Sequence, residues 1–247
     1  MPTLVSIAYS PWSIRTRFAL DAMGVRYEKR AYIPVLSEPR LRFGLRRFTG
    51  KVTVPVMFLD DGTVLDDSLD IVLWANSRSD RPLVPEGEVD TVRTWNGVAE
   101  VLLAAGRLRT TRRLQNTPEA LSESLPSPIR MLGPVGMVIG RDATRRLLEK
   151  YPADDTLDRM TEALGSLRAA LTRGEDRPVA PTDRLITDRL TYADITCAVG
   201  LSFVKPHDKH PLGPVSRQCW TEPDLADHNP DLLQWRDAVM AEARALR

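Results

Sequence analysis

The sequence predicts a small α/β domain followed by a larger all-α domain. Strand and helix patterns alternate over the N-terminal third, prolines and a glycine then interrupt residues 81–87, and strand patterns stop beyond that point. We therefore expect a first domain at residues 1–80, a linker at 81–87 and a second domain at 88–247.

The first domain begins with a strand, a turn and a helix. The apolar run Leu4–Ala8 predicts the strand, and apolar residues that recur every four positions from Ile14 to Ala22 predict a helix over Trp12–Met23. Asp61-Gly62 predicts a hairpin turn, whereas Pro34–Gly50 suggests an irregular, arginine-rich segment. The other elements that we expect here are strands at Arg26–Ala31, Val54–Leu59 and Thr63–Leu65 and a helix at Asp67–Ser77.

The second domain shows only helical periodicity. Its expected helices cover Glu88–Arg113, Asp155–Thr172 and Thr191–Val204, and a last helix starts at Asn229-Pro230, where Asn suits the cap and Pro the first turn. Pro126–Gly140 is apolar but broken by proline and glycine, so we assign it no element.

Composition excludes several classes of protein. The hydrophobic share of 43% and the charged share of 27% are those of an ordinary globular protein. A net charge of +1 argues against a dedicated nucleic-acid binder. The chain has no long apolar run or signal-like N-terminus, and its only cysteines are Cys197 and Cys219. We therefore expect a cytoplasmic protein without a nucleic-acid or membrane partner.

The segment Tyr9–Arg15 is the strongest functional signal. A strand, a turn that carries Ser10-Pro11 and a helix N-terminus follow one another. The unpaired amides of a first helical turn and the helix dipole both favour an anion at this place. A hydroxyl at Ser10 adds one more hydrogen-bond donor, so the pattern predicts a pocket for a thiolate.

Two further motifs in the first domain suit the same kind of ligand. A proline that opens a strand, as in Val54-Pro55, is tolerated when its peptide bond is cis and the strand edge faces a ligand. Asp66-Asp67-Ser68 begins a helix, whose N-terminus suits a carboxylate, while a nearby Asp suits an ammonium group. A ligand with an α-amino acid end satisfies both.

Together these motifs resemble the cytosolic glutathione transferases. The matching pieces are Ser10-Pro11-Trp12-Ser13 with Arg15, Val54-Pro55, Asp67-Ser68, Leu83-Val84-Pro85 and Thr191-Tyr192-Ala193-Asp194-Ile195. Each motif is weak alone, but five in the right order are specific. The resemblance implies a thioredoxin-like N-terminal domain that binds glutathione and an all-α C-terminal helical domain that supplies an apolar substrate pocket. It also implies a homodimer, and glutathione as co-substrate without a metal.

The resemblance assigns roles to individual residues. In the serine classes a hydroxyl after the first strand donates a hydrogen bond to the glutathione sulfur, and Ser10 matches that position. Val54, next to Pro55, would pair with the cysteinyl part, and Asp67 and Ser68 would hold the γ-glutamyl end. The resemblance further places Lys51 near the glycyl carboxylate and Trp12 beside the sulfur.

Other interpretations compete with these roles. Ser10 is also a suitable helix cap, Tyr9 is a rival for the thiol, and Ser13 occupies the second position of what would be a Cys-x-x-Cys motif. Because both positions of that motif are serine, thiol–disulfide exchange is disfavoured. We interpret Cys197 as a small core residue.

Charged and metal-binding side chains have simpler interpretations. His207 and His210 lack a third metal ligand in the sequence. Two arginine clusters are interpreted as solvated faces, with attraction of an acidic second substrate or of glutathione as the alternative: Arg40, Arg42, Arg46 and Arg47, and Arg107, Arg109, Arg112 and Arg113.

The chain also departs from the family pattern. Asp67-Ser68 stands where Glu-Ser is usual, and the loop Ile33–Gly50 lacks the usual Asn-Pro, which leaves the contact of Lys51 open. We expect a glutathione transferase that joins glutathione to an apolar electrophile, as in detoxification. A glutathione-dependent lyase, isomerase, dehalogenase or ether-cleaving enzyme, or a non-catalytic glutathione-binding protein, are the alternatives.

Overall fold

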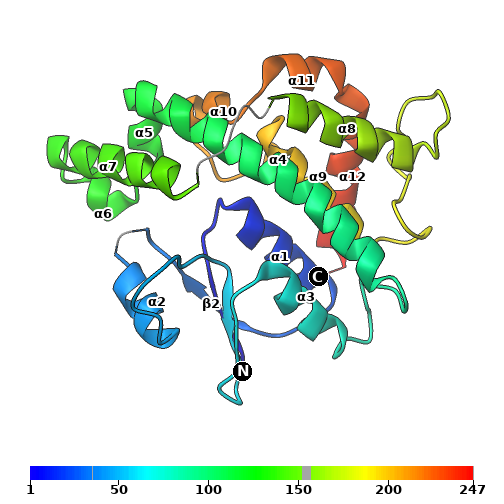
Figure 1. Ribbon diagram of the computed structural model, residues 1–247, viewed down its shortest axis with the longest axis horizontal. Helices are drawn as coiled ribbons and strands as arrows, with labels where there is room; N and C mark the ends of the chain where they lie inside the picture. The colour runs from blue at the N-terminus through cyan, green and yellow to red at the C-terminus, as the bar shows by residue number, and fades with distance from the viewer. Residues whose placement is uncertain (35, 152–156, 247) are drawn as a thin grey trace. The chain divides into compact units, whose positions relative to one another are not determined.

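The computed structural model describes residues 1–34, 36–151 and 157–246 (Figure 1). The chain forms two compact units. The first contains Met1–Asn96, Ile186–Val199 and Val239–Arg247, and the second contains Gly97–Leu185 and Gly200–Ala238. The predicted domain boundary at residues 81–87 stays a prediction, because the first unit also takes in segments from beyond it.

A four-stranded mixed sheet lies at the centre of the first unit, in the order β2-β1-β3-β4. Its strands are β1 (Thr3–Ser6), β2 (Glu28–Ala31), β3 (Val56–Phe58) and β4 (Val64–Leu65). β1 runs parallel to β2 and antiparallel to β3, and β4 returns antiparallel to β3. The parallel pair is joined through α1 (Pro11–Ala22), as a βαβ crossover requires. All four predicted strands are confirmed, each shorter than predicted.

Two helices of this unit pack against each other: α1 and α3 (Ser68–Asn76). The apolar residues that predicted α1 are buried, among them Ile14 and Phe18, and Leu20 and Ile71 are fully buried. The hairpin at Asp61-Gly62 is also confirmed, since Gly62 has a φ of +87° and Asp61 accepts the Thr63 amide at 2.9 Å. A thioredoxin-like arrangement of sheet and helices results.

The prediction of an irregular segment at Pro34–Gly50 is wrong in part, because α2 (Glu38–Gly44) lies within it. Leu41 is the one buried residue of this short helix, and it packs in a cluster with Val5, Val52 and Val56. Arg42 donates to Glu38 one turn earlier. A single apolar anchor gives no visible periodicity, so packing rather than pattern decides this helix.

The linker and the start of α9 (Tyr192–Gly200) belong to the same unit. Asn76 accepts the amides of Leu83 and Val84 at 2.8 Å each, which fixes the predicted linker to the end of α3. Asp194 accepts both the amide and the hydroxyl of Thr191, at 2.8 and 2.6 Å. Thr191 and Asp194 therefore form a capping pair at the start of α9, with Asp194 as the acceptor.

The described residues of the second unit form no strand, in agreement with a largely helical C-terminal part. Its helices are the later part of α4 (Val89–Asn116), α5 (Pro118–Ser124), α6 (Ser127–Arg130), α7 (Pro134–Lys150), α8 (Leu157–Leu171), the 3₁₀ helix η1 (Leu201–Phe203), α10 (Pro214–Cys219), α11 (Pro223–His228) and part of α12 (Pro230–Ala245).

Three expectations for the helical C-terminal part need correction or qualification. The unassigned Pro126–Gly140 forms α6 and the start of α7. The helix expected over Thr191–Val204 ends at Gly200 and continues as η1. In the helix expected over Asp155–Thr172, Asp155 and Thr156 lie outside the described residues, and α8 begins at Leu157.

A buried carboxylate, not solvent, balances the second arginine cluster. Glu222 accepts from Arg109 at 2.7 and 3.0 Å and from Arg113 at 2.6 Å. Arg107 stacks on Tyr151 at 3.7 Å from the ring centroid, and only Arg112 is exposed. The interpretation of this cluster as a solvated face is therefore wrong for most of its members, because long-range partners are invisible in the sequence.

In the first arginine cluster, two arginines form ion pairs and two are solvated. Arg42 pairs with Glu38, and Arg47 donates to Asp66 at 2.7 Å. Arg40 and Arg46 are exposed, as a solvated face requires.

In the part of the chain that the structure describes, no helix combines the length and the apolar character needed to cross a membrane.

One ion pair of the second unit makes stability depend on pH. Burial raises the pKa of the Asp231 carboxyl, but hydrogen bonds from Arg168, Val179 and Leu232 outweigh burial and hold that pKa at about 2, below its ordinary 3.8. The depressed pKa stabilises the fold above about pH 4, and this contribution is lost as pH falls through about 2.

We therefore expect Asp231→Asn to lower the free energy of unfolding by about 2 kcal/mol at neutral pH, at 1.36 kcal/mol per pH unit of pKa difference. Urea unfolding followed by tryptophan fluorescence measures it. The difference from wild type should shrink toward zero at about pH 2. Asp227→Asn, at an exposed aspartate of α11, is the control and should leave stability unchanged. A difference that persists at low pH would contradict this assignment.

Candidate functional site

The register of the sheet brings the three predicted motifs of the first unit to one end of it. Val5 of β1 pairs with Val56 of β3, and Met57 of β3 pairs with Leu65 of β4. Because these strands alternate in direction, the chain that leaves β1, the chain that enters β3 and the chain that leaves β4 all lie at the same sheet end. Those are the segments that carry Ser10, Val54-Pro55 and Asp67-Ser68.

Ser10 occupies the N-cap of α1, but its hydroxyl does not cap the helix. The residue is half-buried and extended, with φ −68° and ψ 124°, and its side chain makes no capping hydrogen bond. Its carbonyl accepts the Ile14 amide at 2.8 Å, which starts the helix. The alternative in which Ser10 serves as a side-chain cap is therefore wrong, and the hydroxyl remains available to a ligand at the positive end of α1.

The neighbours of Ser10 have different environments. Ser13 is fully buried, and its Oγ accepts the Ile7 amide at 3.1 Å, so it ties the helix to the turn that precedes it. Arg17 also holds this turn, since it donates to the carbonyls of Ile7 and Ala8. Burial raises the pKa of Tyr9, so its phenol stays protonated. Trp12 is half-buried in the first turn of α1.

The segment before β3 presents backbone groups. The Val54-Pro55 peptide is cis, as predicted. Among the described residues, neither the amide nor the carbonyl of Val54 makes a backbone hydrogen bond. Val54 is half-buried and precedes the strand, so both groups can pair with an extended ligand. Lys51 is exposed three residues earlier.

Asp67 and Ser68 at the start of α3 have different hydrogen-bonding roles. Asp67 is the N-cap: its Oδ1 accepts the amides of Leu69 at 2.7 Å and Asp70 at 3.2 Å. Asp67 is exposed, and its Oδ2 accepts no hydrogen bond from the described residues, so it can accept one from an ammonium group. Ser68 is only 4% exposed. Its Oγ accepts from Nη2 of Arg15 at 2.6 Å.

Arg15 is the residue to which sequence reasoning gave no role. It is 1% exposed, and while Nη2 donates to Ser68, Nη1 donates to Oγ1 of Thr196 on α9 at 3.0 Å. Oγ1 of Thr196 in turn donates to Asn96 at 3.4 Å. The signal was present, because Arg15 lies four and seven residues before the buried Ala19 and Ala22, on the same helix face.

The buried charge at Arg15 is part of a polar region that includes α9. Asp194 is fully buried two residues before Thr196, and Cys197 follows it. Burial, and next the Asp194 carboxylate, raise the pKa of the Cys197 thiol, and Arg15 opposes them only partly. The thiol therefore stays protonated, which fits the interpretation of Cys197 as a core residue rather than a nucleophile.

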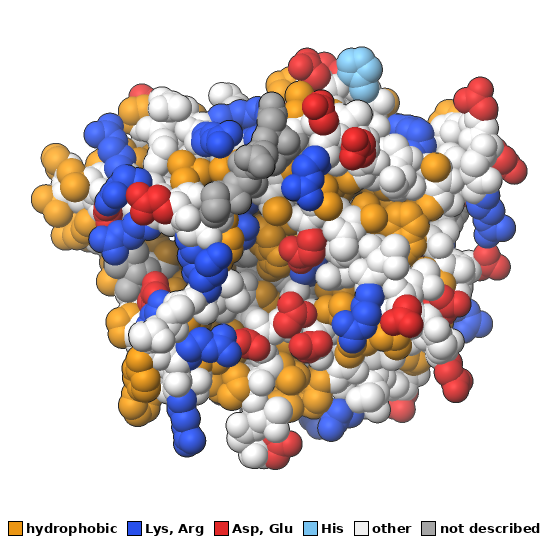
Figure 2. All heavy atoms as spheres, viewed as in Figure 1, with side chains coloured by type: hydrophobic (Ala, Val, Ile, Leu, Met, Phe, Trp, Pro, Cys, Tyr) orange, Lys and Arg blue, Asp and Glu red, His pale blue; other side chains and the backbone are white. Residues whose placement is uncertain are grey.

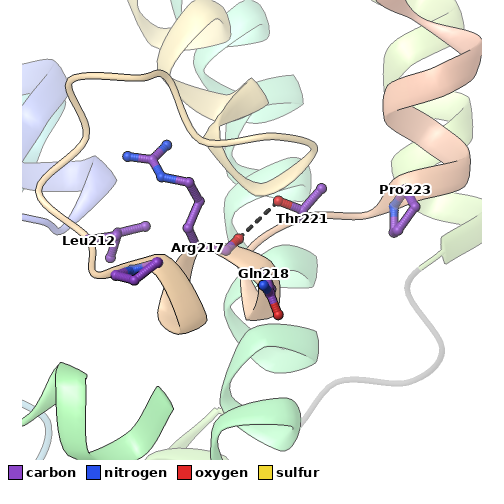
Figure 3. Close-up of a pocket in the computed structure, with 6 residues that line it drawn as sticks. Leu212, Arg217, Gln218, Thr221 and Pro223 are labelled. Carbon is purple, nitrogen blue, oxygen red and sulfur yellow. Dashed lines mark hydrogen bonds between the residues drawn. The ribbon is translucent and has the colours of Figure 1, made fainter. Parts of the chain in front are cut away.

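Two hollows of the structure contain none of the predicted glutathione-site residues. The larger, of about 610 Å³ in the second unit, is lined by Leu212, Pro214, Arg217, Gln218, Thr221 and Pro223 (Figure 3). Arg217 already donates to the carbonyls of Pro206, His207, Asp208 and His210, so it fastens a loop. The other, in the first unit, has Arg26, Arg78 and Arg81 around Trp74.

The described residues contain no group of three or more acidic, histidine or cysteine side chains able to hold an ion. His207 accepts the Lys209 amide through Nδ1, and the buried His210 lies against Trp220, with ring centroids 5.0 Å apart. Both histidines therefore have structural neighbours.

Comparison with known proteins agrees with this geometry. Residues 9–78, from the Ser10 turn through α3, match the family model of the glutathione S-transferase N-terminal domain. A search of curated proteins found no significant match. The matched range contains every residue that we assigned to glutathione.

Solved structures show the same fold along the whole chain. A glutathione transferase family member from Pseudomonas fluorescens Pf-5 with bound glutathione is 19% identical, with a TM-score of 0.59 over 100% of this chain and 98% of that one. GSTFuA3 from Phanerochaete chrysosporium is 17% identical, with a TM-score of 0.61 over 100% and 97%. A glutathione S-transferase from Methylobacterium radiotolerans in complex with glutathione sulfonate is 20% identical, with a TM-score of 0.57 over 96% and 88%.

The class of protein follows from these observations. The chain has a thioredoxin-like N-terminal sheet and helices, a largely helical C-terminal part and the glutathione transferase fold. Its residues 9–78 match the family model of the glutathione S-transferase N-terminal domain.

The fork of Arg15 gives a test of the site's framework. We expect Arg15→Lys to lower the free energy of unfolding by about 1–3 kcal/mol, because one ammonium group cannot replace both arms of the guanidinium and leaves a buried hydroxyl without its donor. Chemical denaturation measures it. Arg26→Lys, which makes the same change at an exposed arginine, should be neutral. Equal stabilities for the two variants would show that the fork does not hold α1, α3 and α9 together.

Proposed function

We propose that this protein is a glutathione transferase in which the Ser10 hydroxyl stabilises the glutathione thiolate for attack on an apolar electrophile. One observation carries the proposal: Ser10 sits at the N-terminus of α1 with a hydroxyl that is not used as a cap. The family match over residues 9–78 and the fold support glutathione as the ligand.

The energies are sufficient for this role. A free thiol has a pKa of about 8.5, and lowering it by about two pH units requires roughly 2.7 kcal/mol of preference for the anion. A hydrogen bond to a charged acceptor supplies about 1.5–3 kcal/mol. A helix N-terminus adds roughly 0.3–1 kcal/mol. One hydroxyl and one helix end therefore suffice without a general base.

The rest of the proposed site positions glutathione. The backbone groups of Val54 pair with the cysteinyl residue, in the manner of an added strand. Asp67 accepts from the ammonium of the γ-glutamyl end. The Ser68 hydroxyl receives a hydrogen bond from Arg15, so its own proton can go to the γ-glutamyl carboxylate. We also propose Lys51 for the glycyl carboxylate, Trp12 for the side of the sulfur that faces the electrophile, and a homodimer as the assembly.

The burial of Ser13 and the bond to its Oγ favour a structural role over a catalytic one. Tyr9 remains the main rival of Ser10, because a protonated phenol is also a hydrogen-bond donor.

The thiol pKa tests the role of Ser10. In an ultraviolet titration of bound glutathione, we expect the wild-type thiolate band to develop well below the free value, and Ser10→Ala to raise the midpoint by about two pH units with the dissociation constant of the protonated thiol nearly unchanged. Tyr9→Phe is the matched control and should leave the midpoint in place. A shift in Tyr9→Phe but not in Ser10→Ala would move the role to Tyr9. Binding without any early thiolate band would indicate a binding protein rather than an enzyme.

A second experiment tests Asp67. Asp67→Asn keeps a good N-cap and removes the negative charge, so α3 should stay intact while affinity for glutathione falls about tenfold, the loss of one charge-assisted hydrogen bond. Calorimetric titration with glutathione and with an analogue that lacks the α-amino group measures this. The analogue should bind both variants equally. A tenfold loss with the analogue as well would show that the ammonium is not the partner of Asp67.

A further inference from the structure

The second unit exposes an apolar surface at the turn after α6 and the start of α7. It consists of Met131, Leu132, Val135 and Val138, which are 86%, 53%, 61% and 65% exposed, and we name it the α6–α7 apolar face. Nine large hydrophobic side chains are exposed in the described chain, and four of the nine lie within residues 131–138. Figure 2 shows hydrophobic side chains gathered at its left edge, where Figure 1 places α6 and α7.

Glycines explain why these side chains point outward. A Cβ on Gly136 would lie 2.1 Å from the carbonyl oxygen of Ile129, and one on Gly140 would lie 2.8 Å from Leu125. Gly136 and Gly140 are the buried residues of α7, so its backbone approaches α5 and α6 closely at these two positions. Val135 and Val138 are not needed for that packing, so they are left to solvent.

The charge around the face is positive. Residues 126–141 contain no acidic side chain, and their charges are Arg130 and Arg141, both exposed. Neither arginine forms an ion pair within the described residues. The acids that follow on α7 are already neutralised by arginines of the same helix: Asp142 by Arg145 and Arg146, and Glu149 by Arg145.

We propose that the α6–α7 apolar face docks on an anionic lipid surface. Aliphatic side chains flanked by arginines are the composition of segments that insert shallowly at a bilayer interface. Four such side chains offer on the order of 400 Å² of apolar area for insertion. Insertion into lipid requires no complementary partner surface.

This proposal concerns contact with a membrane surface. Our expectation of no membrane partner rested on the lack of a spanning segment, and interfacial docking needs none. The proposal does not depend on glutathione, so either can fail without the other.

Co-sedimentation with vesicles tests it on the full chain. We expect wild type to pellet with vesicles of phosphatidylcholine that contain about one-third phosphatidylglycerol, and much less with phosphatidylcholine alone. Val135→Asp/Val138→Asp should reduce the bound fraction at least tenfold. Arg130→Gln/Arg141→Gln should remove the preference for anionic vesicles, and added salt should do the same.

Val89→Asp is the matched control, since it makes the same change at an exposed valine outside the face. It should bind like wild type. Circular dichroism checks that each variant is folded. No binding by wild type, or equal binding by Val135→Asp/Val138→Asp, overturns the proposal. If light scattering shows that this double variant loses a dimer that wild type forms, and vesicles bind neither, the occupant is a second copy of the chain.

A spectroscopic probe reports the depth of insertion directly. Both native cysteines are buried, so Met131→Cys gives one reactive thiol for an environment-sensitive fluorophore. We expect a blue shift with anionic vesicles and quenching by spin-labelled acyl chains. A spectrum that vesicles leave unchanged would show that the face stays in water.

Discussion

The hydrogen-bonded fork of Arg15 is the constraint on which the candidate site depends. Burying a guanidinium charge is costly, and Arg15 is only 1% exposed. The hydrogen bonds that Ser68 of α3 and Thr196 of α9 accept from its two arms offset this cost. Those contacts fix α1, which begins at Ser10, to the start of α3. The positions of the proposed thiol donor and of the proposed γ-glutamyl site are therefore set by one buried side chain.

The candidate site contains two kinds of polar group: those with unused hydrogen-bonding capacity and those bonded within the protein. Asp67, Ser10 and Val54 keep hydrogen-bonding capacity that the described chain leaves unused, and all three lie at the sheet end where β1, β3 and β4 meet. Arg15, Ser13 and Asp194 are buried and bonded within the protein. A rigid inner layer thus supports an outer layer that can bind a ligand, which is the arrangement that thiolate stabilisation by fixed donors requires.

The second unit is stabilised by different interactions. Its arginines are balanced by carboxylates far away in sequence, as Arg109 and Arg113 are by Glu222 and Arg168 is by Asp231. Its glycines allow α7 to approach α5 and α6 closely, which turns valines toward solvent. Stability here comes from charge pairs and close packing, and the exposed apolar face is a consequence of that packing.

The sequence by itself determined the β-α-β and β-β-α order, the cis Val54-Pro55 bond and the hairpin at Asp61-Gly62, because local periodicity and turn chemistry are written in neighbouring residues. Only the tertiary structure decided that α2 is a helix, that Ser10 does not cap its own helix, and that Arg15 joins three elements. Leu41 stabilises α2 by packing on residues of the sheet and the loop before β3, and the partners of Arg15 lie 53 and 181 residues away. Such contacts depend on how distant segments fold together, so local sequence patterns do not predict them.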